Sequence, residues 1–135
     1  MLNMNLQNLN FTHNKILYLP DEICQLPSLI SLRMDHNSLK YLPEDIGNLK
    51  NLRFLTLGYN DLRALPESLG LCRNLVELAV NDNKLDNLHW NLGSNSELKT
   101  LLLHGNKIVM LPSSLCSLTN LETVSLEWFM YYSPA

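Results

Sequence analysis

The chain has 135 residues, of which 46% are hydrophobic and 17% charged, a composition typical of one packed domain and not of a disordered segment. Its formal net charge of -3 and its scattered Lys and Arg residues argue against a nucleic-acid partner. No uninterrupted apolar run of about 18 residues occurs, so we expect no membrane insertion.

A repeat of constant length organises the whole chain. Leu-Pro pairs occur at residues 19–20, 42–43, 65–66 and 111–112, and Leu88-His89 is the one departure. We predict a single domain with an N-cap (1–5), five full repeats (6–28, 29–51, 52–74, 75–97 and 98–120) and a partial, capping repeat (121–135). Asparagine recurs at the same interval of 23 residues, at Asn14, Asn37, Asn60, Asn83 and Asn106.

Each repeat contains a Leu-x-Leu segment, and this period of two predicts a short strand with one buried face. Because a crossover separates successive strands, they must pair in parallel. The Pro in the outer half of most repeats lacks a backbone donor and suits an irregular arc of 3-10 turns or short helices. The predicted strands are residues 9–11, 32–34, 55–57, 78–80, 101–103 and 124–126.

The repeated asparagines follow these strands, where the chain turns into the interior and its backbone groups lose water. An Asn side chain carries a donor and an acceptor, so it can pair with such groups. We therefore predict that the asparagines form an internal structural ladder along the stack of repeats.

Each repeat follows the pattern LxxLxLxxNxLxxLPxxLxxLxx, as in the stretch from Leu52 to Leu62. The pattern resembles the leucine-rich-repeat family in its 23-residue LP form, over roughly residues 6 to 126. The resemblance implies an α/β fold: a right-handed leucine-rich-repeat solenoid (horseshoe), with a parallel β-sheet on the concave face and 3-10 or short helical turns on the convex face. It also implies protein binding, because similar repeats occur in intracellular scaffolds that bind Ras-type GTPases and in effectors that bacterial pathogens deliver into host cells.

Two repeats depart from the pattern. In the fourth, His89 replaces Pro, Trp90 follows it, and Asn95 stands where an inward Leu is usual. We interpret this repeat as a loosened outer arc, with a convex-side contact through Trp90 as the alternative. In the sixth, Phe129 takes the ladder position within the aromatic segment 128–132. We interpret that segment as a cap over the last sheet edge, with a partner-binding patch as the alternative.

The third, fifth, seventh and eighth residues of each repeat are predicted to face solvent on the concave side. Neighbouring strands lie about 4.8 Å apart, so equivalent residues form columns that a partner could cover. Exposed aromatic side chains flanked by charges are typical of binding hot spots, so we predict a protein-binding face centred on Phe54 and Tyr59. The candidate partner-binding residues are Arg33, Asp35, His36, Phe54, Tyr59, Glu77, Asp82, Leu102, His104, Glu127 and Trp128.

The sequence contains no Gly-rich phosphate loop, CxxC pair, HExxH or GxSxG motif. His13 and His36 share a column beside Asp35, but side chains of adjacent columns meet by construction, and we expect no metal site. We therefore expect no cofactor and no enzymatic activity. A chain of this kind acts by contact, as a scaffold or as an inhibitor or regulator of its partner.

By resemblance, the partner is a small GTPase or an enzyme that the chain inhibits. The alternative function is the substrate-recognition fragment of a larger enzyme, a ligase or phosphatase, whose catalytic domain is not in this chain. Cys24, Cys72 and Cys116 are an odd number of thiols without close pairing, and the first five residues lack the basic and apolar regions of a signal peptide. We therefore expect a cytoplasmic location, or the host cytosol for a bacterial effector.

Overall fold

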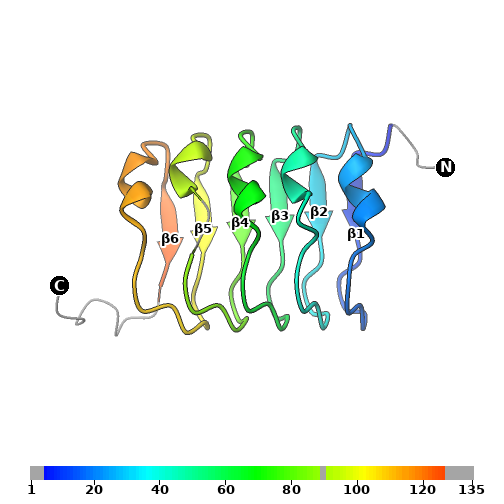
Figure 1. Cartoon of the computed structure of the whole chain (residues 1–135), viewed down its shortest axis with the longest axis horizontal. Helices are drawn as coiled ribbons and strands as arrows, with labels where there is room; N and C mark the ends of the chain where they lie inside the picture. The colour runs from blue at the N-terminus through cyan, green and yellow to red at the C-terminus, as the bar shows by residue number, and fades with distance from the viewer. Residues whose placement is uncertain (1–4, 89–90, 127–135) are drawn as a thin grey trace.

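The computed structural model describes residues 5–88 and 91–126. Six short strands form one parallel sheet in chain order, and each pairs with the next in the register of the repeat, as in Leu9 with Leu32. Figure 1 shows the strands side by side, with helical turns in a second row in front of them. The strands are β1 (Asn8–Asn10), β2 (Ser31–Arg33), β3 (Phe54–Thr56), β4 (Glu77–Ala79), β5 (Thr100–Leu102) and β6 (Thr123–Ser125).

Each strand begins and ends one residue earlier than predicted. Pairing starts early because the N–H of Ser31 already donates to the Gln7 carbonyl, at 3.0 Å. It also continues beyond the strand end, since the N–H of Leu57 donates to the Ala79 carbonyl at 2.7 Å. The predicted parallel sheet is therefore confirmed, with bounds that differ by one residue.

The convex side carries 3-10 helices throughout the described residues. Pro20, Pro66 and Pro112 directly precede η1, η3 and η5, with φ of -68°, -67° and -68°. The proline ring imposes this φ, and the position needs no backbone donor. The predicted solenoid of parallel strands and 3-10 turns is thus confirmed. The helices are η1 (Asp21–Gln25), η2 (Ile46–Asn48), η3 (Glu67–Leu71), η4 (Leu92–Ser94) and η5 (Ser113–Ser117).

Within the described ranges, none of the helices has the length and apolar character needed to span a membrane.

The core lies between the sheet and the row of 3-10 helices. Burial of one leucine side chain stabilises the fold by about 1.5–3 kcal/mol, and every repeat contributes several. A repeat on its own would leave both flanks of this core in water, so the stability belongs to the stack. The fully buried leucines include Leu29, Leu32, Leu52, Leu55, Leu75, Leu78, Leu98 and Leu101.

Asn60 shows how an asparagine joins two repeats. Its Nδ2 donates to the Met34 carbonyl of the preceding repeat and to the Leu57 carbonyl of its own, both at 3.0 Å. Its Oδ1 accepts the N–H of Leu39 at 2.9 Å. The same three kinds of bond are made by Asn37, Asn83 and Asn106.

A second row of asparagines, which we did not predict, lies on the opposite edge of the solenoid, where the chain approaches each strand. Asn51, Asn74 and Asn120 each donate from Nδ2 to a carbonyl of the preceding repeat, at 2.8 or 2.9 Å. Both edges of the stack are therefore held by side-chain amides.

The interpretation of the fourth repeat as a loosened arc is wrong at Asn95. This side chain is 1% exposed, and its Nδ2 donates to the carbonyls of Leu69 (3.1 Å) and Cys72 (3.0 Å). A buried amide can replace an inward Leu when carbonyls of the neighbouring repeat lie within reach. Other residues of the two unusual repeats lie outside the described residues, namely His89, Trp90 and the segment 128–132.

Candidate functional site

The concave face presents the side chains that alternate with the buried strand leucines. Phe54 of β3 lies between Ser31 of β2 and Glu77 of β4 in one row. Phe54 and Glu77 are half-buried, and Arg33 in the next row is exposed. The guanidinium carbon of Arg53 lies 5.8 Å from the centre of the Phe54 ring, within the range of a cation–π contact.

Part of this face is less open than predicted. Ser31, Thr56 and Ala79, which alternate with the leucines, are buried, and so is Gly58 just beyond β3. These four residues are small, and the side chains of Asp35 and Asn81 in the adjacent repeats lie against Gly58. The strand residues that stay exposed on the face are Arg33 of β2 and, at the two ends of the sheet, Asn8, Asn10 and Thr123.

In this turn, the eighth residue of each repeat has a left-handed backbone. The φ angle is 62° at His13, 58° at His36, 57° at Tyr59, 56° at Asp82 and 73° at Gly105. This conformation costs an L-residue roughly 1–2 kcal/mol, whereas Gly adopts it freely. The repeat geometry thus imposes the same backbone on five different residues.

The repeated turn brings three aromatic rings into one stack. The ring centres of His13 and His36 lie 4.3 Å apart at an interplanar angle of 10°, and those of His36 and Tyr59 lie 4.4 Å apart at 7°. Tyr59 is 51% exposed, and both histidines are exposed. We call His13, His36 and Tyr59 the ring stack; it forms a flat aromatic rim where the strands end.

Asp35, a candidate partner-binding residue, bonds to the neighbouring repeat. Its Oδ2 accepts the hydroxyl of Thr56 at 2.6 Å, and its Oδ1 accepts the N–H of Gly58 at 3.0 Å. The carboxylate therefore supports the turn that leads to Tyr59.

Beyond the ring stack, the rim becomes polar. His104 Nε2 lies 3.7 Å from the Asp82 carboxylate, and its Nδ1 lies 2.6 Å from the Ser125 hydroxyl. Asn81 donates from Nδ2 to the same carboxylate at 2.9 Å. A Cβ at Gly105 would collide with the Asp82 carboxylate, so a larger residue there would require the Asp82 side chain to move.

The predicted binding residues fall into two groups. Phe54 begins β3 and Tyr59 follows its end, so the two aromatic residues lie at opposite ends of the same strand. The rim group contains Asp35, His36, Tyr59, Asp82 and His104, and the strand group contains Arg33, Phe54, Glu77 and the half-buried Leu102. Glu127 and Trp128 lie outside the described residues.

The left-handed turn itself had a signal in the sequence that we did not use. The eighth-position column contains Asp82 and Gly105, two residue types that tolerate positive φ. That column therefore indicates a turn with positive φ rather than a continuation of the strand.

Metal-binding groups and reactive cysteine thiols would be the other sources of chemistry in the described part of the chain. No group of three or more His, Cys, Asp or Glu side chains there could hold a metal ion. Burial raises the pKa of the Cys24 and Cys72 thiols to about 11, and the carboxylates of Asp45 and Asp21 add to the shift at Cys24. These two thiols are consequently poor nucleophiles at neutral pH.

Residues 4–62 match the leucine rich repeat family model, and residues 97–118 match a second leucine rich repeat model. The two segments together cover more than half of the chain and coincide with the repeats described above. The chain is a leucine-rich-repeat protein.

Solved leucine-rich-repeat structures share this fold. A protein of Leptospira interrogans is 32% identical, with a TM-score of 0.76 over 85% of this chain. Internalin C2 of Listeria monocytogenes is 27% identical, with a TM-score of 0.81 over 92%. The ectodomain of the Arabidopsis thaliana receptor kinase GASSHO1/SCHENGEN3, solved with Casparian strip integrity factor 2, is 30% identical, with a TM-score of 0.82 over 91%.

The present leucine-rich-repeat chain spans 30%, 53% and 16% of those three chains, respectively. A comparison with curated proteins gave no significant match. Leucine-rich-repeat domains are protein-interaction modules and typically have no catalytic activity.

Proposed function

We propose that this chain binds a partner protein on its concave face and uses the ring stack as the principal contact. The observation that carries the proposal is the ring stack itself, three nearly parallel rings that end in a half-exposed tyrosine. Aromatic side chains of this kind are enriched among residues that dominate binding energy.

Backbone strain at Tyr59 supports the proposal. The φ of 57° is unfavourable for a bulky residue, and Gly105 shows that glycine serves the same turn in another repeat. An aromatic side chain at this position costs stability, and strain of this kind tends to occur at functional sites.

The rigidity of the surface also favours binding. The rings are held by six paired strands and by the asparagine ladder, so docking orders few additional groups. A preformed surface loses less conformational entropy on binding, and a few aromatic contacts then suffice for useful affinity.

We further propose that the chain acts on its partner by contact alone, as a scaffold or as an inhibitor. Related leucine-rich-repeat proteins bind protein or peptide partners, which supports a polypeptide as the ligand. Among polypeptides, we propose a small GTPase or an enzyme whose active site the solenoid covers.

The test is a pull-down with the immobilised chain, followed by mass spectrometry. The variant Phe54→Ala/Tyr59→Gly removes the half-buried Phe54 ring and the exposed Tyr59 ring, and Gly at position 59 relieves the left-handed strain, so the fold is retained. We expect it to lose the partner that the wild type captures. Leu71→Ala/Arg73→Ala, at exposed positions outside the concave face, is the matched control and should retain capture.

Retention of the partner by the Phe54/Tyr59 variant would place the binding site elsewhere. Activity assays on the captured partner then separate the two modes of action. An inhibitor lowers that activity in proportion to the complex formed, whereas a scaffold leaves it unchanged.

We propose a reducing compartment, the cytoplasm, as the location. Cys24 and Cys72 are free and buried, as expected where thiols remain reduced. Immunoblotting of fractionated source cells tests this, and recovery in the extracellular fraction alone would contradict it.

A further inference from the structure

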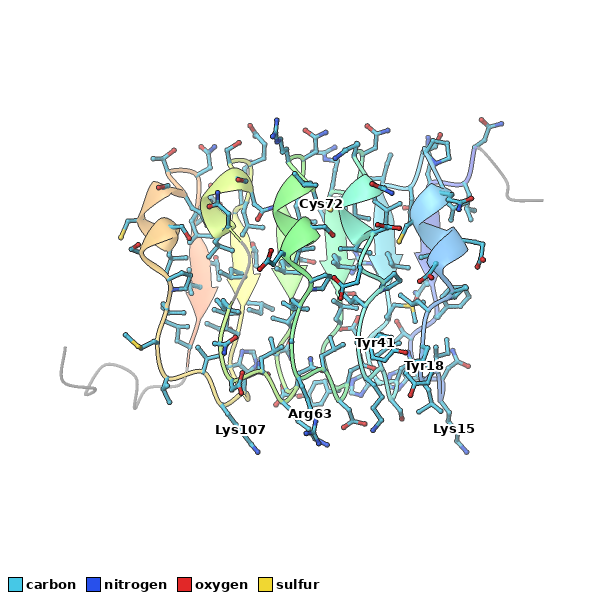
Figure 2. The ribbon with its side chains drawn as sticks, viewed as in Figure 1. Lys15, Tyr18, Tyr41, Arg63, Cys72 and Lys107 are labelled. Carbon is cyan, nitrogen blue, oxygen red and sulfur yellow. The ribbon has the colours of Figure 1, made fainter. Side chains whose placement is uncertain are left out.

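A second surface lies outside the concave face, on the loops that follow each ladder asparagine. We call residues 15–18, 38–41, 61–64, 84–87 and 107–110 the turn edge. In Figure 2, Lys15, Arg63 and Lys107 project from one edge of the molecule, with Tyr18 and Tyr41 beside them.

The turn edge has the opposite charge to the rest of the chain. It contains five of the ten basic residues and two acidic ones, Asp61 and Asp86, which gives a formal charge of +3 in a chain of net charge -3. The five basic residues come from five successive repeats, so they form a row along the solenoid axis. They are Lys15, Lys40, Arg63, Lys84 and Lys107.

The turn edge is also where exposed apolar side chains gather. Of the eight exposed large apolar side chains among the described residues, five lie on it. Tyr18 and Tyr41 pack together at its N-terminal end, with ring centres 4.8 Å apart, and Leu17 lies beside them in the chain. Val109 and Met110 lie at its C-terminal end, and Met110 is 77% exposed.

A groove of about 210 Å³ lies between these apolar ends, lined by Arg63, Lys84, Asp86 and Lys107. Lys84 and Lys40 pair with Asp61 at 3.1 and 3.3 Å, and these hydrogen bonds lower the pKa of Asp61. Arg63 and Lys107 form no ion pair with another described residue, so their charges remain available to a ligand.

We propose that the turn edge binds an acidic segment of a partner protein that also carries apolar side chains. The guanidinium of Arg63 and the ammonium of Lys107 pair with its carboxylates, and the two apolar ends receive its apolar residues. Four strand spacings of about 4.8 Å give the edge a length of about 19 Å, which matches roughly six residues of extended chain.

The mixture of charges favours a polypeptide over a phosphate polymer or a membrane. Asp61 and Asp86 interrupt the basic row and would repel a continuous polyanion. A polypeptide can instead place its carboxylates opposite the basic residues and neutral groups opposite the two aspartates.

The probes are fluorescein-labelled ten-residue peptides, each with four Glu and two Leu residues at different spacings. Fluorescence anisotropy with the full chain measures Kd at low and at physiological salt. We expect at least one peptide to bind and to weaken as salt rises, and its analogue with Gln in place of Glu to lose most affinity.

Arg63→Glu/Lys107→Glu tests the groove and should raise Kd about tenfold or more. The matched control is Arg73→Glu/Lys99→Glu, which changes net charge equally at exposed positions outside the turn edge and should leave Kd near the wild-type value.

Leu17→Ser/Met110→Ser tests the apolar ends and should also weaken binding, whereas Leu71→Ser on η3 should not. Phe54→Ala/Tyr59→Gly should bind the peptides normally, which separates this surface from the concave face.

Several results would overturn the proposal. One is the failure of every peptide to bind at low salt, and another is equal loss in the two charge-reversal variants. Binding to phosphatidylserine vesicles, without peptide binding, would assign the edge to a membrane surface. Self-association that only the edge variant abolishes would assign it to a second copy, whose 3-10 helices carry exposed acidic residues such as Asp21 and Glu67.

Discussion

At the scale of single residues, the same side chain has different consequences at equivalent positions. Asn60 is buried and bonds to two repeats, whereas Asn14 is exposed and its Nδ2 bonds only within its own turn, to the Phe11 carbonyl at 2.7 Å. Water can replace the bonds of Asn14, but it cannot reach the partners of Asn60.

We predict that Asn60→Ala lowers the free energy of unfolding by about 1–3 kcal/mol, because it leaves buried backbone groups without partners. Asn14→Ala, the matched control, should lower it by less than about 1 kcal/mol. Urea unfolding followed by circular dichroism measures both changes. Equal effects of the two substitutions would contradict a ladder whose strength depends on burial.

The cysteines differ in the same way. Cys24 and Cys116 occupy the same position of their repeats, yet Cys24 is buried and Cys116 is exposed. Cys24 lies in η1, which packs against η2 of the following repeat, whereas η5 is the last arc among the described residues.

We predict that iodoacetamide at pH 8 modifies Cys116 first in the folded chain. A thiol with a pKa of about 11 is about one-thousandth thiolate at this pH, and burial also blocks the reagent, so Cys24 and Cys72 should react slowly. Mass spectrometry of tryptic peptides gives the three rates. In urea, all three should become similar; rapid modification of Cys72 in the native chain would refute the assigned burial.

At the scale of elements, the 3-10 helices approach one another closely at a glycine. Gly47 of η2 faces η3, where its N–H donates to the Ser68 hydroxyl at 3.0 Å, and that hydroxyl donates to the Glu44 carbonyl at 2.6 Å. A Cβ at Gly47 would collide with the Ser68 carbonyl oxygen. Gly93 of η4 has more room, because an added Cβ would lie 3.3 Å from Ser117 Cβ.

Gly47→Ala should therefore destabilise the chain by about 1–3 kcal/mol, since backbone and not a flexible side chain must move. Gly93→Ala, the control in the equivalent position, should change the stability by less than about 1 kcal/mol. Thermal and urea unfolding of both variants test this expectation. A stabilising effect of Gly47→Ala would show that η2 and η3 are not in such close contact.

At the scale of the whole molecule, the solenoid is a linear stack in which each repeat contacts its neighbours. The equal offset of all five strand pairs means that Leu75 is equivalent to Leu52. Removal of one complete repeat therefore preserves the register of those that remain.

We predict that deletion of residues 52–74 yields a folded chain with a lower urea midpoint and an m-value reduced by roughly a fifth. Deletion of residues 52–71, which is three residues shorter than a repeat, should abolish cooperative unfolding, because strands and asparagines lose their register. Equal stability of the two deletion variants would contradict a stack of interchangeable repeats.

The sequence alone determined the repeat length, the parallel sheet, the strand positions to within one residue and the row of ladder asparagines. It could do so because each of these features depends on a local pattern that recurs in every repeat, and coils of equal length can stack in only one register. The environment of Leu55 or Asn60 can therefore be predicted from its position in the repeat.

Only the tertiary structure decided which variable residues are accessible. The burial of Ser31 and Thr56, the separation of Phe54 from Tyr59, the bonds of Asp35 and the ring stack all depend on side chains in adjacent repeats and on the left-handed turn. The charge and apolar ends of the turn edge also arise only when residues 23 positions apart are brought together. The physical reason is that stacking sets the contacts between repeats. The pattern within one repeat does not determine the sizes and charges of the side chains in the repeats beside it.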